Sequence, residues 1–147
     1  MKRRKTNLPS LIFTFFMSLF VNYCVYGQQE IIYCDFNGNE IRRTVVGTSI
    51  DEPLMNTGMQ PRNMILDQSN NSLYWIENDT DVFMMSVDGS GKQEVPINAS
   101  EGIGDLTLDE ENQILYYNEF FSGNINAYNI QSQEVNTIIT NAEQGSI

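Results

Sequence analysis

Carboxylates are the residues of this sequence with the most capacity for chemistry, because nineteen of its 147 residues are Asp or Glu. Several stand at predicted turns, where their oxygen atoms could hold a calcium ion. These turn acids are Asp67, Asp79, Asp81, Asp88 and Asp109. The segment 79–82 lacks the EF-hand spacing and the Gly and Glu that complete such a loop. Solvated turns are therefore the favoured interpretation, and calcium is the minor alternative.

Catalytic chemistry has little support. The sequence contains no histidine, which excludes Ser-His and Cys-His catalysis and His-based zinc sites within it. It shows neither a phosphate-binding loop nor a Gly-x-Ser-x-Gly elbow. Pairs of acids arise by chance in an acidic chain, and nothing marks one as desolvated. We therefore predict no catalytic, cofactor-binding or metal-binding residues and no enzymatic activity.

The first 27 residues have the order of a secretory signal peptide. Met1–Lys5 is basic, Leu11–Val21 is apolar apart from two hydroxyl residues, and Val25-Tyr26-Gly27 places small residues before a cleavage point. Cleavage would leave Gln28 as the first residue. An uncleaved signal anchor is the alternative, but the apolar segment is shorter than the roughly 20 residues of a spanning helix. We expect a secreted protein or one on the extracellular face of the plasma membrane.

Removal of this segment makes the chain strongly acidic. Four basic residues, Arg42, Arg43, Arg62 and Lys92, then face nineteen acids, for a net charge of −15. No basic patch could follow a phosphate backbone, so nucleic-acid binding is excluded, and an anionic membrane surface would repel the chain. A basic partner or a cation would be attracted. Simple solubility is the alternative explanation of the charge.

Cysteines and glycosylation sequons fit the exported interpretation. Cys24 leaves with the signal, so Cys34 stands alone and a disulfide framework within the chain is excluded. Its apolar neighbours favour a buried thiol over a partner outside this sequence. Sequons place candidate N-glycosylation at Asn70, Asn78 and Asn98.

An internal repeat of 42 residues organises the rest of the chain. Segment 64–75 (MILDQSNNSLYW) corresponds to segment 106–117 (LTLDEENQILYY), with Leu-Asp and Leu-Tyr-aromatic at matching positions. Each unit predicts four short strands separated by polar turns, and a period of about 40 to 45 residues is typical of propeller blades. We therefore predict an all-β chain. A half blade and connection occupies 28–60, blades occupy 61–102 and 103–143, and another blade starts at 144–147.

Within the half blade, Ile31–Phe36 is expected as a third strand and Glu40–Val46 as a fourth. A long connection is expected over 47–60. The aromatic residues of the second strands, Tyr74, Trp75, Tyr116 and Tyr117, are expected to pack between sheets more than to contact ligands.

The repeat resembles the YWTD repeat, also called the low-density-lipoprotein-receptor class B repeat. Pro61–Asp67 looks like the family's opening strand, Leu73–Glu77 stands at its Tyr-Trp-Thr-Asp signature, and Val87–Lys92 looks like its Asp-Gly-Ser turn. Signature positions are therefore Arg62, Asp67, Tyr74, Trp75, Glu77, Asp88, Gly89, Asp109, Tyr116 and Tyr117. Glu77 and Glu119 replace the signature Asp, and Gly104 stands where Arg62 stood.

The resemblance implies a six-bladed β-propeller, of which this sequence holds under three blades, so a fragment or an assembly of copies is expected. It implies an extracellular module of low-density-lipoprotein-receptor-related type, which binds a protein ligand or packs on growth-factor-like domains. Lipoprotein, Wnt and matrix partners are all candidates. The alternatives are a calcium-dependent lactonase or gluconolactonase-like hydrolase and a truncated product without function. Arg62 is expected either to bridge neighbouring blades through a carboxylate such as Glu77 or to be a solvated cation.

Overall fold

The computed structural model describes residues 21–25 and 28–140, and every regular element in these ranges is a β-strand. The predicted all-β class is confirmed. No helix in the described ranges is long and apolar enough to cross a membrane.

Twelve strands form three antiparallel sheets of four. The first sheet contains β1 (Val21–Val25), β2 (Gln28–Asp35), β3 (Glu40–Val45) and β4 (Asp51–Asn56). The second contains β5 (Arg62–Asp67), β6 (Ser72–Glu77), β7 (Asp81–Ser86) and β8 (Gln93–Val95). The third contains β9 (Ile103–Asp109), β10 (Ile114–Glu119), β11 (Ile125–Asn129) and β12 (Val135–Ile139). Each sheet is a meander, because strands adjacent in sequence are adjacent in the sheet.

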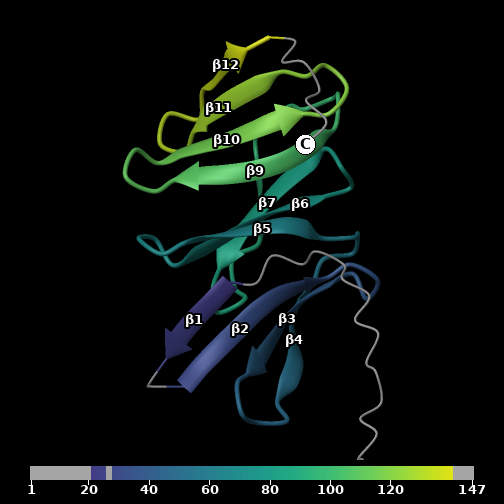
Figure 1. Ribbon diagram of the computed structural model, residues 1–147, viewed down its shortest axis with the longest axis vertical. Helices are drawn as coiled ribbons and strands as arrows, with labels where there is room; N and C mark the ends of the chain where they lie inside the picture. The colour runs from purple at the N-terminus through teal and green to yellow at the C-terminus, as the bar shows by residue number, and fades with distance from the viewer. Residues whose placement is uncertain (1–20, 26–27, 141–147) are drawn as a thin grey trace, which may run out of the picture.

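The sheets stack on one another, with β1–β4 at one end, β5–β8 in the middle and β9–β12 at the other end (Figure 1). The first strand of the middle sheet, β5, contacts β9 of the third sheet and β1 and β2 of the first. This face-to-face stacking of four-stranded meanders is the arrangement expected of successive propeller blades.

The middle sheet is buried on both faces. All six residues of β6 are buried, because Leu73 and Trp75 pack against the first sheet while Tyr74 and Ile76 pack against the third. Successive side chains of a strand point to opposite faces, so this one strand contributes to two apolar cores. Each such fully buried apolar side chain stabilises the fold by about 1.5 to 3 kcal/mol.

The third sheet is covered on one face only. Leu115 and Tyr117 of β10 are buried against the second sheet, whereas the alternate residue Tyr116 is half-buried. All five residues of β12 are exposed, including Val135 and Ile139.

The first sheet differs from expectation in two respects. Segment 47–60 is not only a connection, since it contains β4, and β2 and β3 are the second and third strands of the sheet rather than the third and fourth. Pro53 disguises β4 in the sequence, but a proline is tolerated in this strand because β4 lies at the edge of its sheet.

The other strand of this sheet that the sequence did not predict is β1. It lies inside the predicted signal peptide and pairs with β2 from Val21↔Ile32 to Val25↔Gln28. The chain therefore has three four-stranded sheets where two and a half blades were expected. The rest of the signal segment, and the predicted blade start at 144–147, lie outside the described residues, so signal cleavage stays a prediction.

Candidate functional site

Three loops meet at one edge of the stacked sheets. In an antiparallel meander, the turn between the second and third strands and the connection to the next sheet lie at the same edge. Here these are the turns 78–80 and 120–124 and the connection 96–102. They enclose a pocket of about 360 Å³, which we call the loop-edge pocket. It is lined by Arg62, Asp79, Gly102, Ile103, Gly104, Phe120 and Phe121.

Backbone hydrogen bonds join the three loops. The amide of Ile103 donates to the carbonyl of Asp79 at 2.6 Å, and the amide of Phe120 donates to the carbonyl of Gly102 at 2.7 Å. The amide of Phe121 donates to the carbonyl of Glu101 at 3.2 Å. Gly102 has φ +71°, and a Cβ there would lie 3.7 Å from the Phe121 ring. The pocket is therefore built on fixed backbone.

Arg62 ties the second sheet to the third from inside this pocket. Its guanidinium donates to the carbonyls of Ile103 at 2.6 Å and Gly104 at 3.1 Å, and its Nε donates to Asp79 at 3.0 Å. It does bridge neighbouring sheets, but through the carbonyls of Ile103 and Gly104 and not through a carboxylate as expected. Its acidic partner is Asp79 in a turn of its own sheet, and not Glu77. The reason is strand alternation, because Glu77 lies on the Trp75 face of β6, toward the first sheet.

Phe120 and Phe121 stand at the mouth of the pocket. Their side chains are 57% and 74% exposed, and their rings meet edge to face with centroids 5.1 Å apart. This edge-to-face geometry is a favourable aromatic arrangement. The sequence pattern assigned no role to either ring. The available signal was two adjacent large apolar residues at a turn.

Glu77 holds the opposite interface. It is 3% exposed and accepts hydrogen bonds at 2.7 Å from the Trp75 indole Nε1 and from Lys92 Nζ. Lys92 also donates to the carbonyl of Thr57 at 3.1 Å and lies 4.2 Å from the centroid of the Phe83 ring. The longer acid at the signature position thus anchors the first sheet to the second.

Asp67 lies at the other edge of the second and third sheets and is fully buried. It accepts hydrogen bonds from Ser69 and from the backbone and side chain of Asn70, and Gln113 of the third sheet reaches it at 3.3 Å. Burial favours its neutral form, but these hydrogen bonds outweigh burial and hold the pKa of Asp67 below its usual value.

The remaining signature positions are structural. Tyr74, Trp75 and Tyr117 are buried, and burial raises the pKa of Tyr74 and of Tyr117 to about 12. Tyr116 lies half-buried on the outer face of the third sheet, beside a small pocket of about 160 Å³.

Two further signature positions lie in the turn after β7. Asp88 accepts hydrogen bonds from the Ser90 amide and hydroxyl. Gly89 has φ +89°, and a Cβ there would lie 2.9 Å from the carbonyl oxygen of Leu54. This turn therefore needs glycine to approach β4 closely. In the third sheet, Asp109 accepts hydrogen bonds from the backbone and side chain of Asn112.

The turn acids do not form a metal site in the structure. No group of three or more potential ligands that could hold a metal ion occurs among residues 21–25 and 28–140. Cys34 is a buried free thiol, and burial raises its pKa to about 12. All three sequon residues, Asn70, Asn78 and Asn98, are exposed, but the Asn70 amide nitrogen also donates to Asp67 at 2.9 Å and to Gln113 at 2.8 Å.

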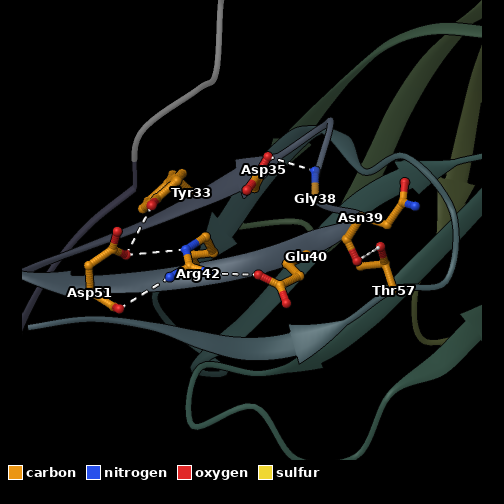
Figure 2. Close-up of polar contacts among 8 residues, drawn as sticks. All are labelled: Tyr33, Asp35, Gly38, Asn39, Glu40, Arg42, Asp51 and Thr57. Carbon is orange, nitrogen blue, oxygen red and sulfur yellow. Dashed lines mark hydrogen bonds and ion pairs between the residues drawn. The ribbon is translucent and has the colours of Figure 1, made fainter.

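The outer face of the first sheet carries a polar network. Figure 2 shows the Tyr33 hydroxyl and the Arg42 guanidinium converging on Asp51, with Glu40 on the other side of Arg42. In the same view, the Gly38 amide donates to Asp35, and the Thr57 hydroxyl donates to the carbonyl of Asn39. This network satisfies the charges of Arg42 within its own sheet.

Comparisons with known proteins show the fold. No family model matches the chain, and no curated protein matches its sequence. A chain in a crystal structure of a nidogen/laminin complex superposes with a TM-score of 0.65 at 12% identity, over 77% of this chain and 44% of that chain. A catalytically inactive virginiamycin B lyase from Staphylococcus aureus, crystallised with quinupristin, superposes with a TM-score of 0.58 at 22% identity. That match covers 74% of this chain and 37% of the lyase.

The chain thus has a β-propeller fold, and it spans less than half the length of either structure. Identities this low establish the architecture of the sheets and not an activity.

Proposed function

We propose that this chain is part of an extracellular β-propeller that binds another protein through the loop-edge pocket. The observation that carries the proposal is the pair Phe120 and Phe121. Both rings are largely exposed, yet their backbone is hydrogen-bonded to the neighbouring loop. Large apolar side chains held rigidly in solvent are typical of interaction sites, because such rings bury much area on binding at a small entropic cost.

The pocket beneath the rings adds shape to this surface. It lies where three loops meet, and Arg62 and Ile103 form part of its wall. A protein partner could insert one side chain here while the two rings cover it. Such small pockets surrounded by aromatic residues are the common form of binding hot spots.

The fold comparison supports the same class of function. One structural neighbour is a chain from a crystal structure of a nidogen/laminin complex, which supports a role in binding another protein. The other neighbour is a lyase, known there in a variant in which a histidine is replaced and activity is lost. The exposed rings of Phe120 and Phe121 favour the binding role over a lyase-like role.

Three finer parts of the proposal rest on the sequence. The YWTD-like repeat favours a module of low-density-lipoprotein-receptor-related type. The signal-like N-terminus favours secretion or display at the cell surface. Growth-factor-like domains and matrix proteins are the partner classes that this resemblance suggests.

The test is a binding panel. The chain, produced in secretory cells, is immobilised and exposed to purified extracellular domains that include laminin fragments and growth-factor-like modules. We expect saturable binding to at least one of them, reduced about tenfold or more by the double substitution Phe120→Ser with Phe121→Ser. Phe36→Ser is the matched control, since Phe36 is an exposed aromatic residue in a turn of the first sheet. Binding that survives loss of both rings contradicts the proposal.

A further inference from the structure

Charge distinguishes the partners that the loop-edge pocket could accept. All four basic residues of the segment 28–140 are already engaged in ion pairs. Arg42 pairs with Glu40 and Asp51, Arg43 with Glu52, Arg62 with Asp79, and Lys92 with Glu77. Most acids within the described residues 28–140 have no such cationic partner among these four. The electrostatic potential around the segment 28–140 is therefore negative.

Several of these acids lie on or next to the loops that form the pocket. A hollow of about 490 Å³ is lined by Thr80, Asp81, Glu94 and residues 96–100, and so lies along the same turn and connection as the loop-edge pocket. Glu101, which is exposed, holds the amide of Phe121 through its backbone carbonyl. Arg62 is the cation in the pocket wall, and its guanidinium is bound to Asp79 and to two carbonyl oxygens.

From these observations we infer that the loop-edge pocket binds a basic protein segment, in which an apolar side chain is flanked by Lys or Arg. The inference rests on the proposed function and names the chemistry of its partner. The apolar side chain enters the loop-edge pocket beneath Phe120 and Phe121, and the flanking cations face Glu94 and Glu101. A Lys or Arg that lies over an exposed ring face gains a further cation–π attraction. An acidic segment meets the same rings but is repelled by the surrounding carboxylates.

The partner is a protein segment and not a free cation. A metal ion would not be coordinated by the exposed phenylalanine rings, and no cluster of metal ligands occurs in the described part of the chain. A ligand that contacts both the rings and the acids must carry apolar and cationic groups next to each other, as a basic protein segment does.

The experiment uses three labelled peptides and the full chain, with binding measured by fluorescence anisotropy. The first has a central leucine between two lysines on each side, the second has glutamates in place of the lysines, and the third has serine in place of leucine. We expect the first to bind at least about tenfold more tightly than either of the others. Raising the salt from about 50 mM to about 500 mM should weaken the first complex severalfold.

Two sets of variants assign the binding to the pocket. Phe120→Ser with Phe121→Ser should weaken the basic peptide about tenfold, while Phe36→Ser leaves it unchanged. Glu94→Gln with Glu101→Gln retains both rings and should weaken it about threefold or more, chiefly through the association rate.

Two results overturn the inference. The first is a glutamate peptide that binds as tightly as the lysine peptide. The second is a lysine peptide whose affinity is the same in the chain without the two rings, because this would show diffuse charge attraction. Either result would leave intact any partner found in the binding panel whose binding depends on Phe120 and Phe121. The proposed function would then stand while the inference fails.

Discussion

The second and third sheets are built on the same 42-residue repeat, yet the molecule uses them differently. Tyr74 is 2% exposed between two sheets, whereas Tyr116, at the equivalent position, is half-buried on an outer face. β6 is buried throughout, while β12 is exposed throughout. The same residue type at the same repeat position is core in one sheet and surface in the other. The presence of a covering sheet therefore decides the role of each strand residue.

The two interfaces of the middle sheet also differ in their polar contacts. Toward the third sheet, Arg62 donates hydrogen bonds to backbone carbonyls, and Asp67 accepts a hydrogen bond from the Gln113 side chain. Toward the first sheet, the buried Glu77 pairs with the half-buried Lys92; Trp75 donates to Glu77, and Lys92 donates to the carbonyl of Thr57. Each side of the sheet thus has its own polar connection to the neighbouring sheet, placed beside an apolar core.

The largest expected effect separates the two tyrosines. Tyr74→Ala should lower the free energy of unfolding by about 3 to 5 kcal/mol, because it removes a ring from a closed core. Tyr116→Ala should cost about 1 kcal/mol, since much of that ring already contacts solvent. Urea denaturation followed by tryptophan fluorescence measures both. Equal losses would show that the outer face of the third sheet is covered in solution, and dilution of the sample would test whether another copy covers it.

A second matched pair compares the signature acids. Glu77→Gln should cost about 1 to 3 kcal/mol, because Lys92 then loses its charged partner at a largely buried position. Glu119 accepts hydrogen bonds from Ser122 and Asn124 within its own loop, so Glu119→Gln should cost about 0.5 kcal/mol or less. Lys92→Met added to Glu77→Gln should restore part of the loss, and a full additive loss would show that the two side chains do not interact.

The repeat explains why the middle of the molecule was predictable. Segments rich in β-branched and aromatic residues, separated by polar turns at the same intervals in both units, predict β5 to β8 and β9 to β12 from local pattern alone. The first sheet was harder, because Pro53 conceals β4 and because β1 falls in a segment with the features of a signal peptide. Pairing to a neighbour, and not local pattern, determines both strands.

The candidate site was less predictable than the fold. The choice of Asp79 over Glu77 as the partner of Arg62 depends on which face of β6 each side chain occupies and on how closely the sheets stack. Phe120 and Phe121 could be noticed as apolar residues in a turn. Their meeting with Gly102, which lies about 20 residues earlier in the sequence, needs the three-dimensional structure.

A smaller effect is expected in the pH dependence of stability, which should differ between Asp67 and an asparagine at the same position. The pKa of Asp67 in the folded protein is below its usual value, so its ionised form stabilises the fold above the unfolded pKa, near 4. This stabilisation is lost as the pH falls through the folded pKa.

Asp67→Asn should therefore cost about 1 kcal/mol at pH 7 and progressively less below pH 4, where the two proteins converge. Urea denaturation at a series of pH values provides the comparison. A stability difference that stays constant down to about pH 2 would mean that the charge of Asp67 contributes nothing.

The smallest expected effect concerns glycan occupancy, and it uses the same bridge between the second and third sheets. Both hydrogens of the Asn70 amide nitrogen are used, one by Asp67 and one by Gln113, and an N-linked glycan replaces one of them. Asn78 and Asn98 are exposed at the loop-edge side. In protein secreted from mammalian cells, glycopeptide mass spectrometry should find glycans at Asn78 and Asn98 and little at Asn70.

Gln113→Ala is the matched control for this prediction, because it frees one hydrogen of the Asn70 amide without changing the sequon. We expect glycan occupancy at Asn70 to rise in this variant while occupancy at Asn78 and Asn98 stays the same. A wild-type protein that carries a full glycan at Asn70 and unfolds at the same urea concentration as its deglycosylated form would show that Asn70 does not bridge the two sheets. The second and third sheets would then be joined by apolar packing and Arg62 alone.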